Sequence, residues 1–228
     1  MSPGEWKGSN IVETNRTLIL GESHYEDDSN SIGKEVPYST AGVVEEYLSQ
    51  HCKTDGRKGR WHRFFDRIAE SFGYSKEHSV DFYKKIWFGN YVNVLCGTGE
   101  ENKACHYMNK NRKEYNDELF SFVNSHDIDV IACFSKEVFW HLPAMAKEDS
   151  DSYRELSLPL TGGRKNVINY YEYAPGVKHD SCDVELKKPL KVYGIRHPSA
   201  RGGFNASQVY KVISNEDALR DICTNNSR

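Results

Sequence analysis

The sequence predicts a single α/β domain, a three-layer sandwich with a mainly parallel central sheet. Its 228 residues are enough for one sizeable core. Short apolar runs of strand length alternate along the chain with longer segments in which apolar residues recur every three or four positions. Such alternation is typical of a sheet covered by helices. No internal repeat and no clear linker divides the chain, so we expect one domain over residues 1–228, with a loose polar lead-in over residues 1–16.

The first expected elements are a strand, a loop and a helix. Thr17–Leu20 is a short, mostly apolar run bounded by Gly21, and it predicts a buried strand. Residues 22–37 are largely polar and contain glycine and proline, so they predict a long surface loop. A helix is expected over Ala41–Gln50, because its apolar residues form a stripe at helical spacing and Thr40 is a suitable N-cap.

The next segment is rich in aromatic residues. Trp61–Phe72 predicts an amphipathic helix, since its large apolar side chains recur every three or four positions. That pattern is more typical of a core than of a surface that stacks on bases. Asp81–Lys85 favours neither helix nor strand. Ile86–Leu95 is enriched in aromatic and β-branched residues and predicts a buried strand.

The second half of the chain continues the alternation. A helix is expected over Tyr115–His126, a strand over Asp129–Phe134 and a helix over Lys136–Leu142. Lys147–Ser157 is charged and rich in serine, which predicts a loop. The remaining expected elements are strands over Asn166–Tyr173 and Leu190–Ile195, a loop over Gly176–Asp183, and C-terminal helices over Ser207–Ile213 and Asn215–Ile222.

The composition narrows the class of protein. Apolar residues make up 38% and charged residues 28%, a balance that fits a soluble globular protein and excludes a disordered chain. No apolar run approaches the roughly 20 residues that span a bilayer, and the N-terminus lacks a secretory pattern. We therefore expect a cytoplasmic, nucleoid-associated protein that is neither secreted nor membrane-bound. The six cysteines form no CxxC pair, so we expect reduced thiols and no metal.

Basic residues are clustered although the net charge is −3. One group runs from Lys53 to Arg63, a second is Arg164-Lys165, and a third contains Arg196, His197 and Arg201. Local patches of this kind can bind phosphate even on an acidic protein. A solvated basic face accounts for each cluster equally well.

Several chemically versatile side chains stand at or just after the ends of predicted strands. Glu22, Ser23 and His24 follow the first strand, Asn90 lies in a central strand, and His197 follows the last one. Sites form at the carboxyl ends of parallel strands. A carboxylate and a histidine at such a place can polarise a water molecule and stabilise a leaving anion.

Further residues suit a flat heterocyclic ligand. Asn90 presents a donor and an acceptor together, which fits the amide-like edge of a nucleobase. Tyr25 and Tyr38 can stack on a planar ring. Purely structural roles stay open beside these: Asn90 as a strand-end cap, Glu22 as a surface acid and His24 as an ordinary loop histidine.

The last strand leads into a loop of mixed chemistry. Arg196-His197-Pro198-Ser199 is followed by Arg201, Gly202 and Gly203. The proline restricts the backbone next to the histidine. Arginine together with glycine suits close approach to a phosphate backbone.

Two of these motifs together resemble the paired active-site motifs of the uracil-DNA glycosylase superfamily. Gly21-Glu22-Ser23-His24-Tyr25 resembles the first motif, which reads Gly-Gln-Asp-Pro-Tyr in some branches and Gly-Glu-Ala-Pro-Gly in others. His197-Pro198-Ser199 matches the His-Pro-Ser core of the second motif. Between them, Pro37-Tyr38 is similar to the element whose ring stacks on the flipped base, and Asn90 is similar to the strand asparagine that binds it.

The resemblance implies a uracil-DNA glycosylase-like fold and a role for each residue. Glu22, with Ser23 beside it in the catalytic segment, would activate water or stabilise the cationic sugar. His197 would donate a hydrogen bond to the base oxygen that becomes negative. Asn90 would form hydrogen bonds with the edge of the base, and Tyr38 would stack on its ring. Tyr25 would restrict the space at C5 of the base. The loop that presses on DNA as the base flips out would be formed by Arg196, Ser199, Arg201, Gly202 and Gly203.

The sequence also departs from the family pattern. Ser23 stands where one branch has a catalytic aspartate, and His24 replaces a proline. The second motif lacks its usual second proline and a leucine, and no four-cysteine pattern of an iron–sulfur cluster is present. These departures favour a diverged substrate, such as a modified or bulky pyrimidine in phage DNA.

We therefore expect a monofunctional DNA glycosylase that hydrolyses the N-glycosidic bond of uracil or a modified pyrimidine, in base-excision repair or in defence against modified phage DNA. It would bind single- or double-stranded DNA as a monomer and need no cofactor. Two alternatives stay open. One is a non-catalytic nucleic-acid-binding protein of the same fold, which Ser23 favours. The other is a hydrolase or transferase on small nucleotides or nucleosides, which the net charge of −3 favours.

Overall fold

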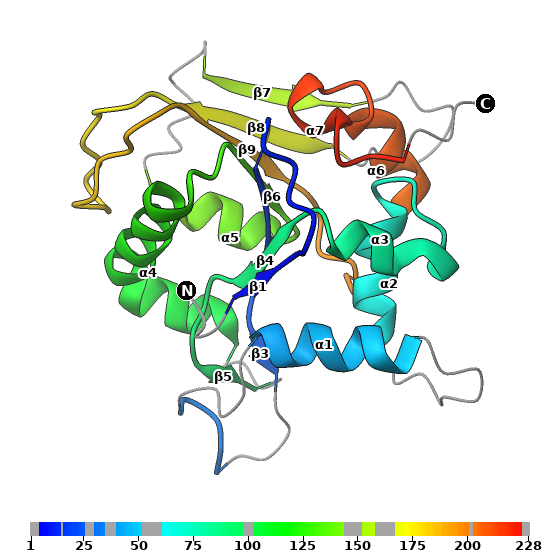
Figure 1. Ribbon diagram of the computed structural model, residues 1–228. Helices are drawn as coiled ribbons and strands as arrows, with labels where there is room; N and C mark the ends of the chain where they lie inside the picture. Colours follow the sequence, from blue (N-terminus) through cyan, green and yellow to red (C-terminus); the bar gives the residue numbers. More distant parts are fainter. Residues whose placement is uncertain are drawn as a thin grey trace.

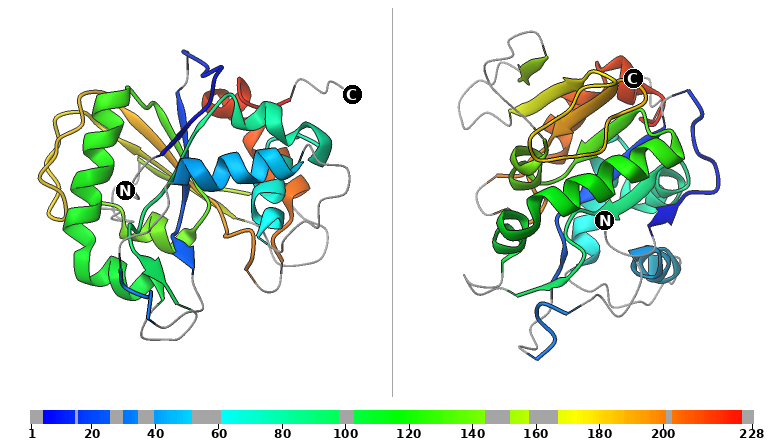
Figure 2. Two further views of the ribbon diagram at one scale, coloured as in Figure 1. Left: turned by 60° about the horizontal axis from the view of Figure 1, so that its bottom comes forward. Right: turned by 90° about the vertical axis from the view of Figure 1, so that its left-hand side faces the viewer.

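The computed structural model is a mixed α/β fold with a large central sheet flanked by helices (Figures 1 and 2). It describes residues 5–14, 16–25, 30–34, 40–51, 61–97, 103–143, 152–157, 167–200 and 203–224. Within these residues the main sheet has seven strands, and its middle is parallel. The predicted class of a sheet covered by helices is therefore confirmed.

The parallel part of the sheet consists of four strands in the order β4-β2-β6-β9. Their bounds are Thr17–Gly21 for β2, Trp87–Asn90 for β4, Val130–Cys133 for β6 and Leu190–Gly194 for β9. Antiparallel strands extend both edges: β1 (Trp6–Lys7) pairs with β4, while β8 (Ile168–Tyr173) and β7 (Tyr153–Leu156) follow β9. A separate pair joins β3 (His24–Tyr25) to β5 (Leu95–Cys96).

Helices cover both faces of the sheet (Figure 1). One face carries α4 (Ala104–His126) and α5 (Lys136–His141). The opposite face carries α1 (Thr40–His51), α2 (His62–Glu70), α3 (Ser79–Tyr83), α6 (Ala206–Ile213) and α7 (Asp217–Arg220), with a 3₁₀ turn, η1, at Lys76–His78.

The alternation of side chains along the central strands builds two cores. On β2, Leu18 and Leu20 face the core beneath α4 and α5, whereas Ile19 belongs to the core on the other face. On β6, Ile131 faces the core beneath α4 and α5, and Ala132 faces the other core. Both faces of these strands are covered, which is why their sequences read as continuous apolar runs.

The strand order places the site. From β2 the chain passes to β4 on one side and then returns to β6 on the other, so the order reverses around β2. In open α/β sheets such a switch point marks the place where ligands bind, outside the carboxyl ends of the strands. Gly21 pairs with Asn90, and Cys133 pairs with Gly194, so the four carboxyl ends lie along one edge of the sheet.

Four expectations about elements are wrong. Residues 1–16 are not merely a loose lead-in, because Trp6 pairs with Phe88 and its indole donates to the Tyr83 carbonyl oxygen at 2.8 Å. The loop expected over residues 22–37 contains β3. The strand expected over Ile86–Leu95 ends at Asn90 and resumes only as β5. The charged segment Lys147–Ser157 contains the edge strand β7.

Other elements differ only in length or type. The helix expected over Tyr115–His126 begins eleven positions earlier, at Ala104, with a break in helical geometry at Asn111. The ambiguous segment Asp81–Lys85 belongs largely to α3. The expected strands over Asp129–Phe134 and Leu190–Ile195 are confirmed to within a residue or two.

The described cysteines form no disulfide, and four of them are buried: Cys96, Cys133, Cys182 and Cys223. Cys52 lies outside the described residues. Of the helices in the described ranges, none is both long enough and apolar enough to cross a membrane.

Candidate functional site

Two cavities meet at the carboxyl edge of the parallel strands. The larger, of about 710 Å³, has aromatic walls, and the smaller, of about 340 Å³, is lined mainly by charged and polar residues. Of the described residues, only Glu22 and His197 line both cavities. These two side chains, which follow β2 and β9, therefore stand at the boundary between the cavities.

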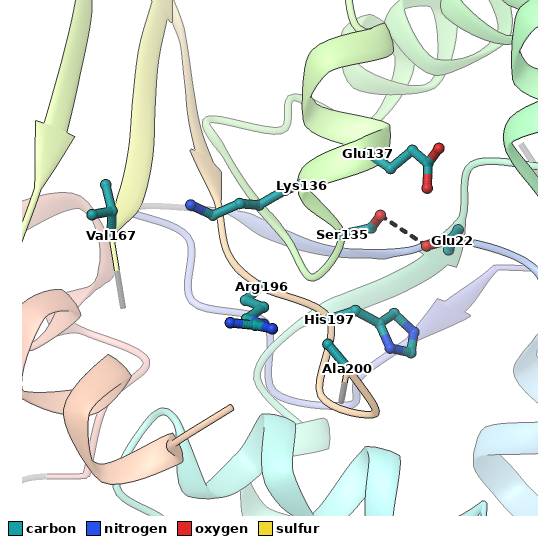
Figure 3. Close-up of a pocket in the computed structure, with 8 residues that line it drawn as sticks. All are labelled: Glu22, Ser135, Lys136, Glu137, Val167, Arg196, His197 and Ala200. Carbon is teal, nitrogen blue, oxygen red and sulfur yellow. Dashed lines mark hydrogen bonds between the residues drawn. The ribbon is translucent and has the colours of Figure 1, made fainter. Parts of the chain in front are cut away.

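Two hydroxyl groups hold the carboxylate of Glu22. The Tyr25 hydroxyl donates to Oε1 at 2.5 Å. The Ser135 hydroxyl donates to Oε2 at 2.9 Å (Figure 3). Ser135 follows β6 and also caps α5, because its Oγ accepts from the Val138 backbone N–H at 3.2 Å. The bond between Ser135 and Glu22 thus links the ends of β6 and β2 and fixes the direction of the carboxylate.

The imidazole of His197 has a defined tautomer in its neutral form. The Ser199 backbone N–H donates to its Nδ1 at 3.1 Å, so the ring proton belongs on Nε2. Burial lowers the pKa of His197, and the negative charge of Glu22 opposes that shift. The Phe64 ring lies 5.2 Å from the imidazole, between ring centres. His197 therefore presents a neutral N–H donor.

The loop that carries His197 is anchored to the scaffold. The Ile195 N–H donates to the Cys133 carbonyl oxygen at 2.8 Å, which continues the β6–β9 ladder past Gly194. The Arg67 guanidinium on α2 donates to the Pro198 carbonyl oxygen. A turn follows, in which the Ala200 N–H donates to the His197 carbonyl oxygen at 3.0 Å.

A polar group lines one side of the larger cavity. The Asn90 side-chain amide donates to His24 Nε2 at 3.0 Å, and Thr40 Oγ1 lies 3.1 Å from the same nitrogen. All three side chains are buried. Burial lowers the pKa of His24 to about 4, so its ring is neutral near pH 7. Gly21 is required beneath this group, because a Cβ there would stand 2.2 Å from Asn90 Oδ1.

Aromatic rings line much of the rest of the larger cavity. Phe64 and Trp61 both contribute, although the spacing of Trp61–Phe72 favoured a core role for its aromatic residues. Trp61 is 38% exposed, whereas Phe65 is buried in the core as expected. The described aromatic lining comprises Tyr25, Trp61, Phe64, Phe65 and Phe88, a composition suited to a flat ligand.

The structure brings together most of the candidate residues that it describes. Glu22, Ser23, Tyr25, Asn90, His197 and Ser199 all line the larger cavity, and Arg196 lines the smaller one. The Ser23 hydroxyl is buried and makes no hydrogen bond in the described part of the chain. Gly203 is exposed, with a φ of +130° that favours glycine. Tyr38, Arg201, Gly202 and the basic groups at Lys53–Arg60 and Arg164-Lys165 lie outside the described residues.

Two expected roles change in detail. Tyr25 was expected only to face the base, yet its hydroxyl holds Glu22. Asn90 was expected to face a ligand, yet its amide nitrogen is bonded to His24, the histidine at the position where the motif that it resembles has a proline. His24 is consequently part of the site, although its sequence context favoured an ordinary loop histidine.

Sequence reasoning missed Ser135, Lys136 and the role of Thr40. Ser135 had a usable signal, because a serine between an apolar strand and a helix is a typical N-cap at a strand end. Thr40 was predicted as a helix cap, but it stands within α1 and contacts His24 instead.

The site offers a fixed carboxylate and a neutral imidazole donor beside an aromatic cavity with an amide on its wall. Such a set can stabilise opposite charges that develop across a breaking bond. No group of three or more histidine, cysteine, aspartate or glutamate side chains in the described ranges is placed to hold a metal ion. No protein-family model matches the chain, and no curated protein matches it.

Proposed function

We propose that this chain is a diverged member of the uracil-DNA glycosylase superfamily, a monofunctional enzyme that removes uracil or a modified pyrimidine from DNA. The observation that carries the proposal is the meeting of Glu22 and His197 at the boundary of an aromatic cavity. Both residues come from the two motifs that resemble the family's, and both follow strands of the parallel part of the sheet, at its carboxyl edge.

The reaction divides charge between the two sides of the breaking bond. As the C1′–N bond breaks, its electron pair leaves with the base and the sugar becomes cationic. The His197 Nε2–H can donate to the base oxygen that gains negative charge, and the Glu22 carboxylate can stabilise the cation and accept a proton from water. The water oxygen then bonds to C1′, and the proton released ends on the departing base.

Base recognition would use the polar group on the wall of the larger cavity. Asn90 keeps its carbonyl oxygen as an acceptor while its amide nitrogen is bound to His24. The neutral ring of His24 fixes that orientation. The cavity volume of about 710 Å³ supports a pyrimidine with a substituent, since pockets of this size commonly hold ligands larger than a single small ring.

The experiment uses labelled oligonucleotides with one test base each. The bases are uracil opposite guanine, opposite adenine and in single strands, together with 5-hydroxymethyl and glucosylated pyrimidines. Alkali then cuts abasic sites. We expect cleavage at one or more of these bases by the wild-type protein and loss of more than a hundredfold in rate for Glu22→Gln and His197→Ala.

The outcomes separate this proposal from its rivals. Cleavage that survives both substitutions contradicts the assigned roles. DNA binding with no abasic product on any substrate favours the non-catalytic alternative. Base release from free nucleotides but not from DNA favours a nucleotide hydrolase, the candidate that the net charge of −3 supports.

A further inference from the structure

The smaller cavity has a chemistry of its own. Lys136, at the start of α5, and Arg196, after β9, both line it, beside Val167 and Ala200. Figure 3 shows the two cationic side chains extending toward the same side, whereas the His197 ring and Glu137 point the other way. Two positive groups from different elements therefore converge on one cavity.

Burial and two neighbouring charges act on the Lys136 ammonium. Burial lowers the pKa of Lys136, the negative charge of Glu155 raises it, and the positive charge of Arg196, a smaller effect than that of Glu155, lowers it. Lys136 forms no ion pair with any described carboxylate. Glu155 accepts from the Tyr153 hydroxyl at 2.9 Å, and Glu22 is held by its two hydroxyl donors. Glu155 and Glu22 thus each accept from hydroxyl groups and form no ion pair with the Lys136 ammonium.

We infer that Lys136 and Arg196 form a binding site for a phosphate group of the substrate. A guanidinium and an ammonium that share one cavity match the oxygen atoms and the negative charge of phosphate. The inference rests on the proposed function for its geometry. With the base in the aromatic cavity and C1′ at Glu22 and His197, the far side of the sugar and its phosphate extend toward the smaller cavity, which shares those two residues.

The phosphate has two possible sources, the backbone of a DNA strand or a free nucleotide. In either case the site makes a substrate with phosphate bind better than the corresponding nucleoside. Lys136 therefore acts on binding, through an element distinct from the loop that carries His197.

The test compares Lys136→Gln with Lys136→Arg and with Lys110→Gln. Lys110 is an exposed lysine on α4 that lines neither cavity, so its loss is a matched change of charge. One arm measures binding of a fluorescent single-stranded oligonucleotide over a series of salt concentrations. The other arm measures thermal stabilisation by deoxyuridine monophosphate and by deoxyuridine.

For DNA, we expect Lys136→Gln to weaken binding by roughly tenfold and to reduce the slope of log affinity against log salt by about 0.7, the change for one lost phosphate contact. Lys136→Arg should restore both, and Lys110→Gln should change neither. For a free nucleotide, the monophosphate should stabilise the wild type more than the nucleoside does, and Lys136→Gln should remove that difference. Effects in the DNA arm alone identify the backbone as the source.

The inference is overturned if Lys136→Gln behaves like Lys110→Gln in both arms, or if the wild type binds neither DNA nor the monophosphate. Its failure is distinct from failure of the proposed function. Base release that does not depend on Lys136 supports the glycosylase and contradicts the phosphate site. Binding that depends on Lys136, with no base release, supports the phosphate site and contradicts the glycosylase.

Discussion

At the scale of residues, the site depends on how its neighbours fix two ionisable groups. Hydroxyl groups from Tyr25 and Ser135 each occupy one oxygen of Glu22, and a backbone N–H sets the tautomer of His197. All three donors, two hydroxyl groups and one backbone N–H, are uncharged. The carboxylate and the imidazole are therefore oriented before any substrate binds, which is the arrangement that electrostatic catalysis requires.

Replacing Ser135 by alanine should lower kcat by more than the accompanying loss of folding stability explains. The substitution removes the donor to Glu22 and the cap of α5, and the cap alone costs about 1 kcal/mol. We expect kcat on the preferred oligonucleotide to fall by roughly tenfold while KM changes little. The measurement is steady-state kinetics together with urea unfolding.

A matched control is Asn205→Ala, which removes the cap of α6, a bond to the Gln208 N–H of the same 3.2 Å length. It should cost similar stability and leave kcat unchanged. Equal losses of kcat in the two variants would mean that Ser135 acts only through the helix.

His24 should make the fold sensitive to acid. Its pKa of about 4 in the folded protein lies below the ordinary 6.5, so only the unfolded chain binds a proton between these values. Stability that is complete above pH 6.5 should therefore fall as the pH drops toward 4, by about 2 kcal/mol between pH 7 and pH 5. Urea unfolding at the two pH values measures it.

The matched substitutions are His24→Gln and His106→Gln, the latter at an exposed position on α4. His24→Gln should lose the share of that pH dependence due to His24 and keep the share due to His197, whose pKa burial also lowers, whereas His106→Gln should keep both shares. A wild-type loss that persists in full in His24→Gln would show that other groups cause it.

At the scale of elements, the close approach of β2 and β4 sets the position of Asn90. The Gly21–Asn90 pair ends the ladder, and the Tyr91 and Val92 N–H groups then donate to the Gly21 and Glu22 carbonyl oxygens, at 3.1 and 3.0 Å. The chain after Asn90 is thereby bonded to the first motif. This arrangement joins the wall of the cavity to the segment that carries the Glu22 carboxylate.

Replacing Gly21 by alanine should displace Asn90, because the new Cβ would stand 2.2 Å from Oδ1. We expect a loss of about 1–3 kcal/mol in stability and weaker base binding. In the Asn90→Ala background the same substitution should cost much less, since the obstructing atom is gone. A double-mutant cycle by urea unfolding measures the difference, and strictly additive losses would contradict the contact.

The elements also show what the sequence could and could not predict. The strand at Thr17–Leu20 and the motifs at the strand ends were predictable, because a compact apolar run between polar segments is typical of a buried strand. The end of β4 was not, since Tyr91 and Val92, which follow it, are apolar and of strand-forming type like the residues before them. The edge strand β7 has a half-exposed, charged sequence that resembles a loop.

At the scale of the whole molecule, one sheet with helices on both faces holds the site at a single edge. The strand order was beyond sequence reasoning, because pairing joins segments far apart in the chain. It is this order that brings Ser135 to Glu22 and Lys136 to Arg196. The sequence singled out Glu22 and His197 as a pair, and the fold adds the neighbours that hold them, such as Ser135.

The same layers should protect the thiols. Burial raises the pKa of Cys96 to about 11 and that of Cys133, Cys182 and Cys223 to about 12. In titration with a thiol reagent, we expect these four to stay unreacted in the native protein and all six cysteines to react in denaturant without reductant. Rapid reaction of all six in the native state would contradict the burial.

The central claim is that Glu22 and His197 release a base from DNA, and mass spectrometry of the products tests it most directly. A DNA strand that carries the preferred base is incubated with the wild type and with Glu22→Gln, after both are shown to bind it equally. We expect the wild type to yield the free base and an abasic strand, and the variant to yield neither at a comparable rate. Intact DNA after incubation with a wild-type protein that binds it, across the whole panel of bases, would contradict the claim.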